Sequence, residues 1–275
     1  MKGKKTVALI AAALTFTMTA CGSSTAITES ASTEESTPSA AAESVLEEES
    51  TPSAITESAL TAESKPATQY TIDANQEVYA LLDFEDTAEF ENATKGLIAS
   101  PDTLDIYDEN GKLVWSQTAY GFLDQDAPDT ANPSLWRNTQ LNHIYGLFEV
   151  TDGIYQVRGY DMSNVTFIKG DTGWIVIDPL MSVECAAAAF SLVEENLGTF
   201  PVKAVIYSHS HVDHFGGVKG IISEEDVQSG DVQVIAPEGF EKYAVSENIY
   251  AGTGMGRRAS YQYGTLLEAG ETGSL

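Results

Sequence analysis

Short apolar runs in the second half of the chain predict β-strands. Residues 153–158 and 164–169 each have the composition of a strand, and a Gly-Asp-Thr-Gly turn joins the second run to residues 174–179. The third run has few polar interruptions, which is typical of a strand buried on both faces of a sheet. We therefore expect three consecutive strands that end at Pro179.

A helix and a fourth strand follow this group. Ser182 is placed to cap a helix over residues 183–197, and Gly198 is placed to end it. The apolar face of this helix is predicted to consist of Val183, Ala186, Phe190, Val193 and Leu197. The run at residues 202–207 predicts the next strand. A strand, a helix and a strand at this spacing form a βαβ unit, in which functional groups lie at the carboxyl ends of the strands.

Further elements are predicted towards the end of the chain. Residues 218–222 resemble the start of a helix, residues 232–236 a strand, and residues 237–248 a helix with proline at its first position. The segment 248–263 contains two adjacent arginines among glycines and aromatic residues.

Residues 70–150 predict a small α+β segment. Apolar residues from Val78 to Ile98 have helical spacing, and alternating apolar residues on both sides of Asn110-Gly111 predict a β-hairpin. His143 stands alone among apolar residues. We interpret it as a hydrogen-bonded structural group and not as a ligand.

The first twenty residues have the pattern of a secretory signal. Lysines precede an apolar run from Val7 to Phe16 that is short for a membrane span, and small residues lead to Cys21. Residues 18–21 resemble a bacterial lipobox. We therefore expect Cys21 to be lipidated, in an exported lipoprotein that faces outward into the periplasm or the extracellular space. An uncleaved anchor and an ordinary secretory signal are the alternatives.

The next stretch is rich in Ser, Thr, Ala, Glu and Pro. With so few branched apolar or aromatic residues it cannot bury enough surface to offset the entropy of ordering, so we predict a disordered tether. The predicted organisation is a signal peptide, a lipidated tether, the N-terminal segment of a catalytic region and an incomplete C-terminal domain, at residues 1–20, 21–69, 70–150 and 151–275.

The composition excludes one class of partner. The 275 residues contain 41 Asp and Glu against 14 Lys and Arg, for a net charge of −27, so nucleic acid would be repelled. With Cys21 assigned to a lipid, only Cys185 remains, so no disulfide within the chain is expected. Cys185 lies in a helix-like stretch, and we interpret it as a small buried apolar residue and not as a nucleophile.

Three of the chain's four histidines lie in one loop directly after the strand at residues 202–207. The candidate metal ligands of this loop are His209, His211, Asp213 and His214. Imidazole and carboxylate groups are ligands that zinc takes, whereas closed structural zinc sites favour cysteine, which is absent nearby. The spacing allows two metal ions to share the loop, and two such ions can activate water for ester hydrolysis.

Two further sites have alternative interpretations. Asp178 ends the third strand, where it either accepts backbone N–H groups in a turn or supports the histidine loop. Arg257 and Arg258 either bind a sulfate group, since guanidinium suits tetrahedral oxyanions, or form a solvated or paired basic turn. The sequence does not identify a catalytic residue beyond the metal ligands.

The pattern HxHxDH at residues 209–214 resembles the metallo-β-lactamase superfamily, and the flanking sequences resemble its secreted alkyl sulfatases. These flanks are residues 135–137, 141–159, 173–180 and 237–260. The resemblance implies part of an αββα sandwich and hydrolysis of alkyl sulfate esters by water or hydroxide bound to metal. It assigns His209 and His211 to one zinc ion and Asp213 and His214 to a second, with two zinc ions per complete site.

The sequence also departs from that family. The family has further Glu and His ligands, yet no histidine follows His214 here. We therefore expect a fragment of a longer protein that is inactive alone and that forms a homodimer at full length. Two alternatives stay open: a hydrolase of lactones, thioesters or β-lactams with the same fold, and a surface lipoprotein without catalytic activity.

Overall fold

The computed structural model describes residues 65–264 and Leu267. The predicted signal peptide, the lipidation of Cys21 and the tether up to residue 64 lie outside the described residues. Gln69, the last residue assigned to the tether, already begins helix α1 (Gln69–Leu81). Within the part of the chain that is described, no helix is both long enough and apolar enough to cross a membrane.

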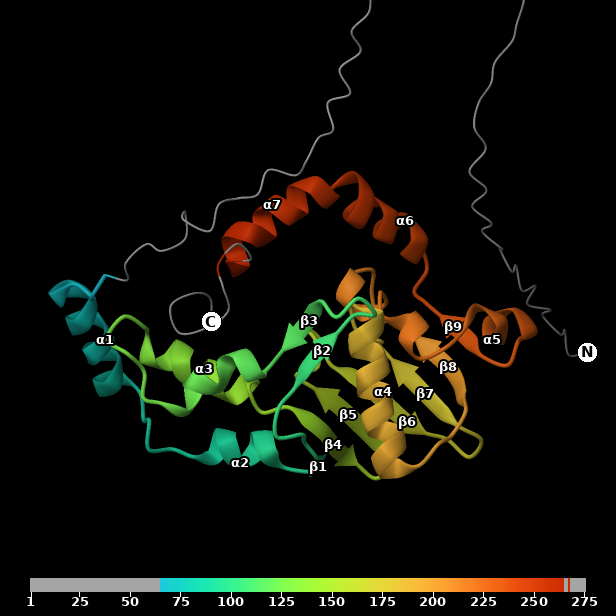
Figure 1. Cartoon of the computed structure of the whole chain (residues 1–275), viewed down its shortest axis with the longest axis horizontal. Helices are drawn as coiled ribbons and strands as arrows, with labels where there is room; N and C mark the ends of the chain where they lie inside the picture. Colours follow the sequence, from blue (N-terminus) through green and yellow to red (C-terminus); the bar gives the residue numbers. More distant parts are fainter. Residues whose placement is uncertain (1–64, 265–266, 268–275) are drawn as a thin grey trace, which may run out of the picture. The chain divides into compact units, whose positions relative to one another are not determined.

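A seven-stranded mixed sheet lies at the centre of the described residues, in the order β1-β4-β5-β6-β7-β8-β9 (Figure 1). Neighbours from β1 to β7 are antiparallel, and β7, β8 and β9 are parallel. The strands are β1 (Leu97–Ala99), β4 (Gly146–Thr151), β5 (Ile154–Arg158), β6 (Val165–Lys169), β7 (Trp174–Ile177), β8 (Val202–Ile206) and β9 (Gln233–Ile235). The predicted mixed α/β fold is confirmed, including the βαβ unit.

Helix α4 (Val183–Leu197) covers one face of the sheet (Figure 1). The Ser182 hydroxyl accepts the Cys185 N–H at 3.1 Å, and Gly198 ends the helix with φ 90°, as predicted. The buried stripe of the helix is Cys185, Ala186, Ala189 and Val193. The prediction that Val183 lies on this stripe is wrong, because its side chain is 40% exposed.

The core forms between α4 and the strand residues that point towards it. Its fully buried side chains include Val157, Val165, Phe167, Trp174, Val176 and Val205. Burial of each such side chain contributes roughly 1.5–3 kcal/mol. In β7, Trp174 and Val176 are buried, whereas Ile175 and Ile177 on the opposite face are half-buried. The expectation that this strand is buried on both faces is therefore only half correct.

The N-terminal segment contains α1, α2 (Ala88–Thr94), a 3-10 helix η2 (Thr118–Asp124), α3 (Pro133–Asn142) and the predicted hairpin of β2 (Asp105–Tyr107) and β3 (Leu113–Ser116). The hairpin packs on α4 (Figure 1). The prediction that helical structure extends to Ile98 is wrong. Gly96 has φ 76°, and Leu97 pairs with Phe148 of β4, so the chain enters the sheet there.

The segment after β8 contains more helix than predicted. Its elements are η4 (Val218–Gly220), α5 (Glu224–Ser229), α6 (Phe240–Val245), the π-helix η5 (Ser246–Tyr250) and α7 (Gly252–Tyr263). The helix predicted at residues 218–222 is a single 3-10 turn. Residues 252–263, for which a basic turn was one of the two interpretations, form α7.

Candidate metal centre

The loop after β8 brings the four predicted ligands together. The His209 ring lies 4.6 Å from the His211 ring and 4.1 Å from the His214 ring, measured between centroids. Asp213 and His214 lie in the 3-10 turn η3 (Val212–His214), and Oδ2 of Asp213 is 3.1 Å from Nε2 of His214. The turn reverses the chain immediately after the strand, so residues close in sequence face one another.

Asp178 connects the end of β7 to this loop. Its Oδ1 accepts the Ser208 N–H at 2.8 Å, and its Oδ2 accepts the Ser208 hydroxyl at 2.6 Å and lies 2.9 Å from Nδ1 of His214. The residue has φ 57°, a conformation that Asp tolerates better than most residues. Asp178 thus accepts a backbone N–H and also contacts the histidine loop, so the geometry unites the two alternatives left open by the sequence.

The contacts of Asp178 define which histidine nitrogens are engaged. The Ser208 hydroxyl donates to Asp178, so it accepts from Nδ1 of His209, which lies 2.9 Å away. Nδ1 of His214 is likewise the donor to Asp178. Nε2 of His209 then carries the lone pair, whereas Nε2 of His214 lies against Oδ2 of Asp213. Carboxylate-supported imidazoles of this kind are typical of metal ligands.

Glu247 is a residue that the sequence reasoning missed. Its Oε1 lies 2.9 Å from Nε2 of His211, and the neighbouring Asn248 amide donates to the Ser210 carbonyl at 3.4 Å. Both come from the π-helix η5, and π-helical turns occur frequently at functional sites. Nothing in the spacing of His211 and Glu247 predicts their contact, because it depends on how the segment after β9 folds back. With Nε2 engaged, His211 has Nδ1 left for an ion.

Gly216 and Gly217 allow the loop to lie directly on the turn between β7 and α4. A Cβ atom on Gly217 would lie 2.3 Å from the Pro179 carbonyl oxygen, and one on Gly216 would lie 2.3 Å from the Met181 carbonyl oxygen. The Gly217 N–H donates to Leu180 at 2.9 Å. Only glycine permits this approach of two backbones.

Asp161 fixes the same turn from the other side. Its buried carboxylate accepts the N–H groups of Met162 at 2.6 Å, Met181 at 3.0 Å and Ser182 at 3.3 Å. Burial raises the pKa of Asp161, and the three N–H donors act in the opposite direction. The Ser163 hydroxyl donates to the Asp213 carbonyl, so residues 161–163 join the turn to the histidine loop.

The remaining candidates lie elsewhere. His143 ends α3 with Nδ1 2.8 Å from Oε1 of Gln117, which confirms a hydrogen-bonded structural group, and burial lowers its pKa. Cys185 is buried as predicted, and burial raises its pKa to about 12. Arg257 and Arg258 are exposed on α7, and the ion pairs between described residues involve neither.

The chemistry of the loop fits zinc, because three imidazoles and a carboxylate are zinc ligands and each imidazole has a hydrogen-bonding partner behind it. In residues 65–264 and at Leu267, no group of three or more His, Cys, Asp or Glu side chains is arranged around a common metal position. The four side chains pair with one another and with Asp178 and Glu247 instead. Their assignment to two ions stays a prediction.

Comparison with known proteins identifies two levels of similarity. Residues 158–272 match the family model described as the metallo-beta-lactamase superfamily. The chain is 51% identical over 211 residues to a linear primary-alkylsulfatase of a Pseudomonas species, and 51% identical over 198 residues to an alkyl/aryl-sulfatase of Saccharomyces cerevisiae. These matches cover 76% and 72% of this chain and 31% of each relative.

A solved structure supports the same relationship. The stereoselective inverting sec-alkylsulfatase of a Pseudomonas species superposes with a TM-score of 0.71 at 53% sequence identity, over 74% of this chain and 32% of that protein. The chain thus spans about a third of the length of the relatives that it matches.

Proposed function

The chain is homologous to alkylsulfatases and contains a metallo-β-lactamase superfamily domain, and on this premise we propose that its protein hydrolyses alkyl sulfate esters with zinc. The observation that supports this most strongly is the histidine loop. It places three imidazoles and Asp213 together, with Asp178 and Glu247 behind the rings. The relatives are alkylsulfatases, which supports alkyl sulfate esters as the substrate class. The imidazole and carboxylate groups of the histidine loop support the use of zinc.

We assign the ligands as the sequence predicts. His209 and His211 hold one zinc ion, and Asp213 and His214 hold a second. Zinc supplies Lewis acidity at the sulfate oxygens and lowers the pKa of water. Ligands outside the described residues complete the site.

Asp178 has the role of orienting two of these ligands. By accepting from Nδ1 of His214 directly and from Nδ1 of His209 through the Ser208 hydroxyl, it engages Nδ1 of both rings and leaves their Nε2 atoms as the positions that bind the ions. Glu247 contacts the other ring nitrogen of its histidine. It engages Nε2 of His211 and so leaves Nδ1 of that ring to bind an ion. These contacts hold the rings in place before metal arrives.

Substrate binding and location are further parts of the proposal. Arg257 and Arg258 on α7 offer guanidinium groups to the sulfate of the substrate, and both are exposed and free to do so in the described chain. Cys21 anchors the protein to the outer face of a bacterial membrane through a lipid, and the full-length protein forms a homodimer.

Comparing sulfate release from dodecyl sulfate with hydrolysis of nitrocefin tests the substrate class. The assay uses the product of the complete genomic reading frame, since the 275 residues match about a third of each relative. We expect sulfate release and no nitrocefin hydrolysis. Turnover of nitrocefin alone, or of a lactone or thioester alone, would instead support another hydrolase of this fold, and no turnover at all would support a binding lipoprotein.

A further inference from the structure

The connection between β5 and β6, residues 159–164, carries several buried side chains although such connections usually lie on the surface. In this β5–β6 loop, Tyr160, Asp161 and Ser163 are 4%, 5% and 8% exposed. The polar side chains that are buried in residues 65–264 and at Leu267 are Asp161, Ser163 and Gln117, and Gln117 donates to the backbone of this loop. Because a buried polar group is costly unless it is hydrogen-bonded, these contacts determine where the loop lies.

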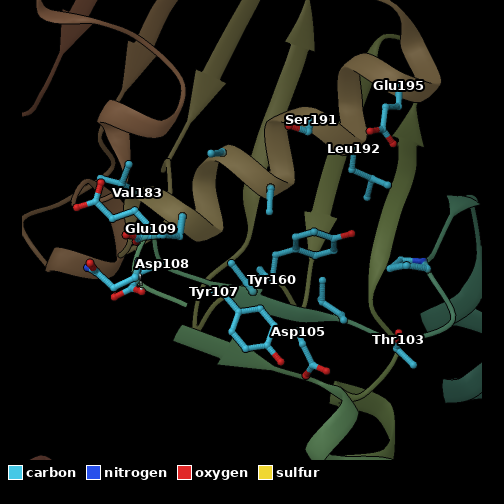
Figure 2. Close-up of a pocket in the computed structure, with 17 residues that line it drawn as sticks. Thr103, Asp105, Tyr107, Asp108, Glu109, Tyr160, Val183, Ser191, Leu192 and Glu195 are labelled. Carbon is cyan, nitrogen blue, oxygen red and sulfur yellow. Dashed lines mark hydrogen bonds between the residues drawn. The ribbon is translucent and has the colours of Figure 1, made fainter. Parts of the chain in front are cut away.

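Three contacts anchor the first half of the β5–β6 loop. The Gly159 carbonyl accepts from the side chains of Trp115 and Gln117 at 2.8 and 2.9 Å. The side chain of Tyr160 lies between α4 and the β2–β3 hairpin (Figure 2). The Asp161 carboxylate accepts two N–H groups of the turn between β7 and α4. The loop is thus attached to the hairpin, to α4 and to the turn before it reaches the histidine loop.

Ser163 connects this anchored loop to one of the candidate metal ligands. Its hydroxyl donates to the backbone carbonyl of Asp213. The backbone N–H groups of residues 214–216 donate to the His211 and Val212 carbonyls instead. In the part of the chain that the structure describes, the bond from Ser163 is the hydrogen bond that joins Asp213 to a residue outside the histidine loop. Loss of the Ser163 hydroxyl therefore removes that external support.

The three imidazole ligands are supported by other parts of the fold. Asp178 supports the His214 ring directly and the His209 ring through a serine hydroxyl. Glu247 contacts the His211 ring. These contacts act on imidazole rings, whereas the contact from the β5–β6 loop acts on the backbone of the carboxylate ligand. The carboxylate ligand and the imidazole ligands can therefore be perturbed separately.

We propose that Ser163 is a positioning residue that holds Asp213 in place for one metal ion. That ion is the one assigned to Asp213 and His214, and the ion assigned to His209 and His211 does not depend on Ser163. The inference rests on the proposed function, which supplies the assignment of ligands to two ions. A hydrogen bond to the backbone of a ligand restricts the peptide that carries it, so less conformational entropy is lost when the metal binds. The support is effective because the β5–β6 loop is itself anchored.

Metal binding by the Ser163→Ala variant, resolved for each ion, tests this role. The variant is made in the product of the complete reading frame, and it removes one oxygen atom without adding volume. Cobalt(II) serves as the probe, because it binds the same kinds of ligand as zinc and its visible absorption changes with the number and geometry of its ligands. The Asp213→Ala variant keeps the ion at His209 and His211 and thereby identifies the absorption of that ion. The absorption missing from Asp213→Ala belongs to the second ion.

In Ser163→Ala, we expect the affinity for the second cobalt ion to fall about tenfold and the affinity for the first to stay within about twofold. Ser229→Ala is the matched control, because the Ser229 hydroxyl also donates to a backbone carbonyl, at 3.0 Å in α5, and its loss should leave both affinities within about twofold.

The possible failures of this experiment are distinguishable. Equal weakening of both ions in Ser163→Ala, as a purely structural role would produce, would overturn the inference. So would unchanged affinities in a variant of a protein that binds two ions, and in that case the proposed function would stand. Absence of cobalt binding by the unaltered protein would overturn the inference together with the proposed function.

Discussion

Replacing Asp178 by Asn should weaken zinc binding by loosening two histidines at once. Oδ1 of Asp178 accepts the Ser208 N–H, while Oδ2 accepts from the Ser208 hydroxyl and from His214. Asn has one acceptor oxygen and an NH₂ group that donates. Whichever way the amide is turned, it places a donor where one set of these contacts needs an acceptor.

The expected size of the effect follows from the role of the residue. Loss of a partner behind a metal-ligating histidine typically costs ten- to a hundredfold in metal affinity, or about 1.4–2.8 kcal/mol. Backbone strain does not add to this cost, because Asn also tolerates the φ of 57° at this position. Asp178→Ala would add strain and is therefore a poorer test.

Competition for zinc with a chromophoric chelator at neutral pH measures this change. Asp171→Asn is the matched control, because Asp171 is an exposed carboxylate in the turn between β6 and β7 and its loss alters the net charge equally. Circular dichroism melts of both variants show whether the fold is retained. A folded Asp178→Asn protein with the zinc affinity of the Asp171→Asn control would refute the proposed role of Asp178.

Three other changes have expected outcomes. Glu247→Gln should lower zinc affinity by about tenfold in the same assay, since a neutral amide replaces the carboxylate beside His211, and unchanged affinity would contradict this. Gly217→Ala should cost about 1–3 kcal/mol of unfolding free energy, because the added Cβ would lie 2.3 and 2.5 Å from two backbone oxygens. Gly254 lies on α7 with open space around it, so Gly254→Ala should stabilise the protein by about 0.5–1 kcal/mol. Equal denaturation midpoints for the two variants would refute the packing argument. Burial lowers the pKa of His143 in the folded state below its ordinary value of 6.5, so between these two pKa values the unfolded state binds more protons than the folded state. Unfolding free energy should therefore rise with pH up to about 6.5, and His143→Gln should reduce that slope; an identical slope in the variant would exclude His143 as its source.

The strands of the sheet and helix α4 could be predicted from the sequence because their signals are local. Period and composition indicate β5, β6, β7 and β8, and Ser182 and Gly198 mark the two ends of α4. The histidine loop could be predicted equally well, since its four candidate ligands lie within six residues directly after a predicted strand.

Features that depend on tertiary structure could not be predicted in this way. Residues 97–99 have helical spacing with their predecessors, but pairing with β4 determines their conformation. Helix α7 forms despite Gly252, Gly254 and Gly256, which disfavour helix. Glu247 reaches His211 only because the π-helix η5 folds back over the loop, and no local pattern encodes that approach.

Sulfate release from dodecyl sulfate, before and after removal of metal, tests the central claim most directly. For the product of the complete reading frame, we predict release that a chelator abolishes and that added zinc restores, with His209→Ala inactive under all conditions. Sulfate release that persists without metal, or that persists in His209→Ala, would contradict the assignment of the histidine loop as a catalytic zinc centre.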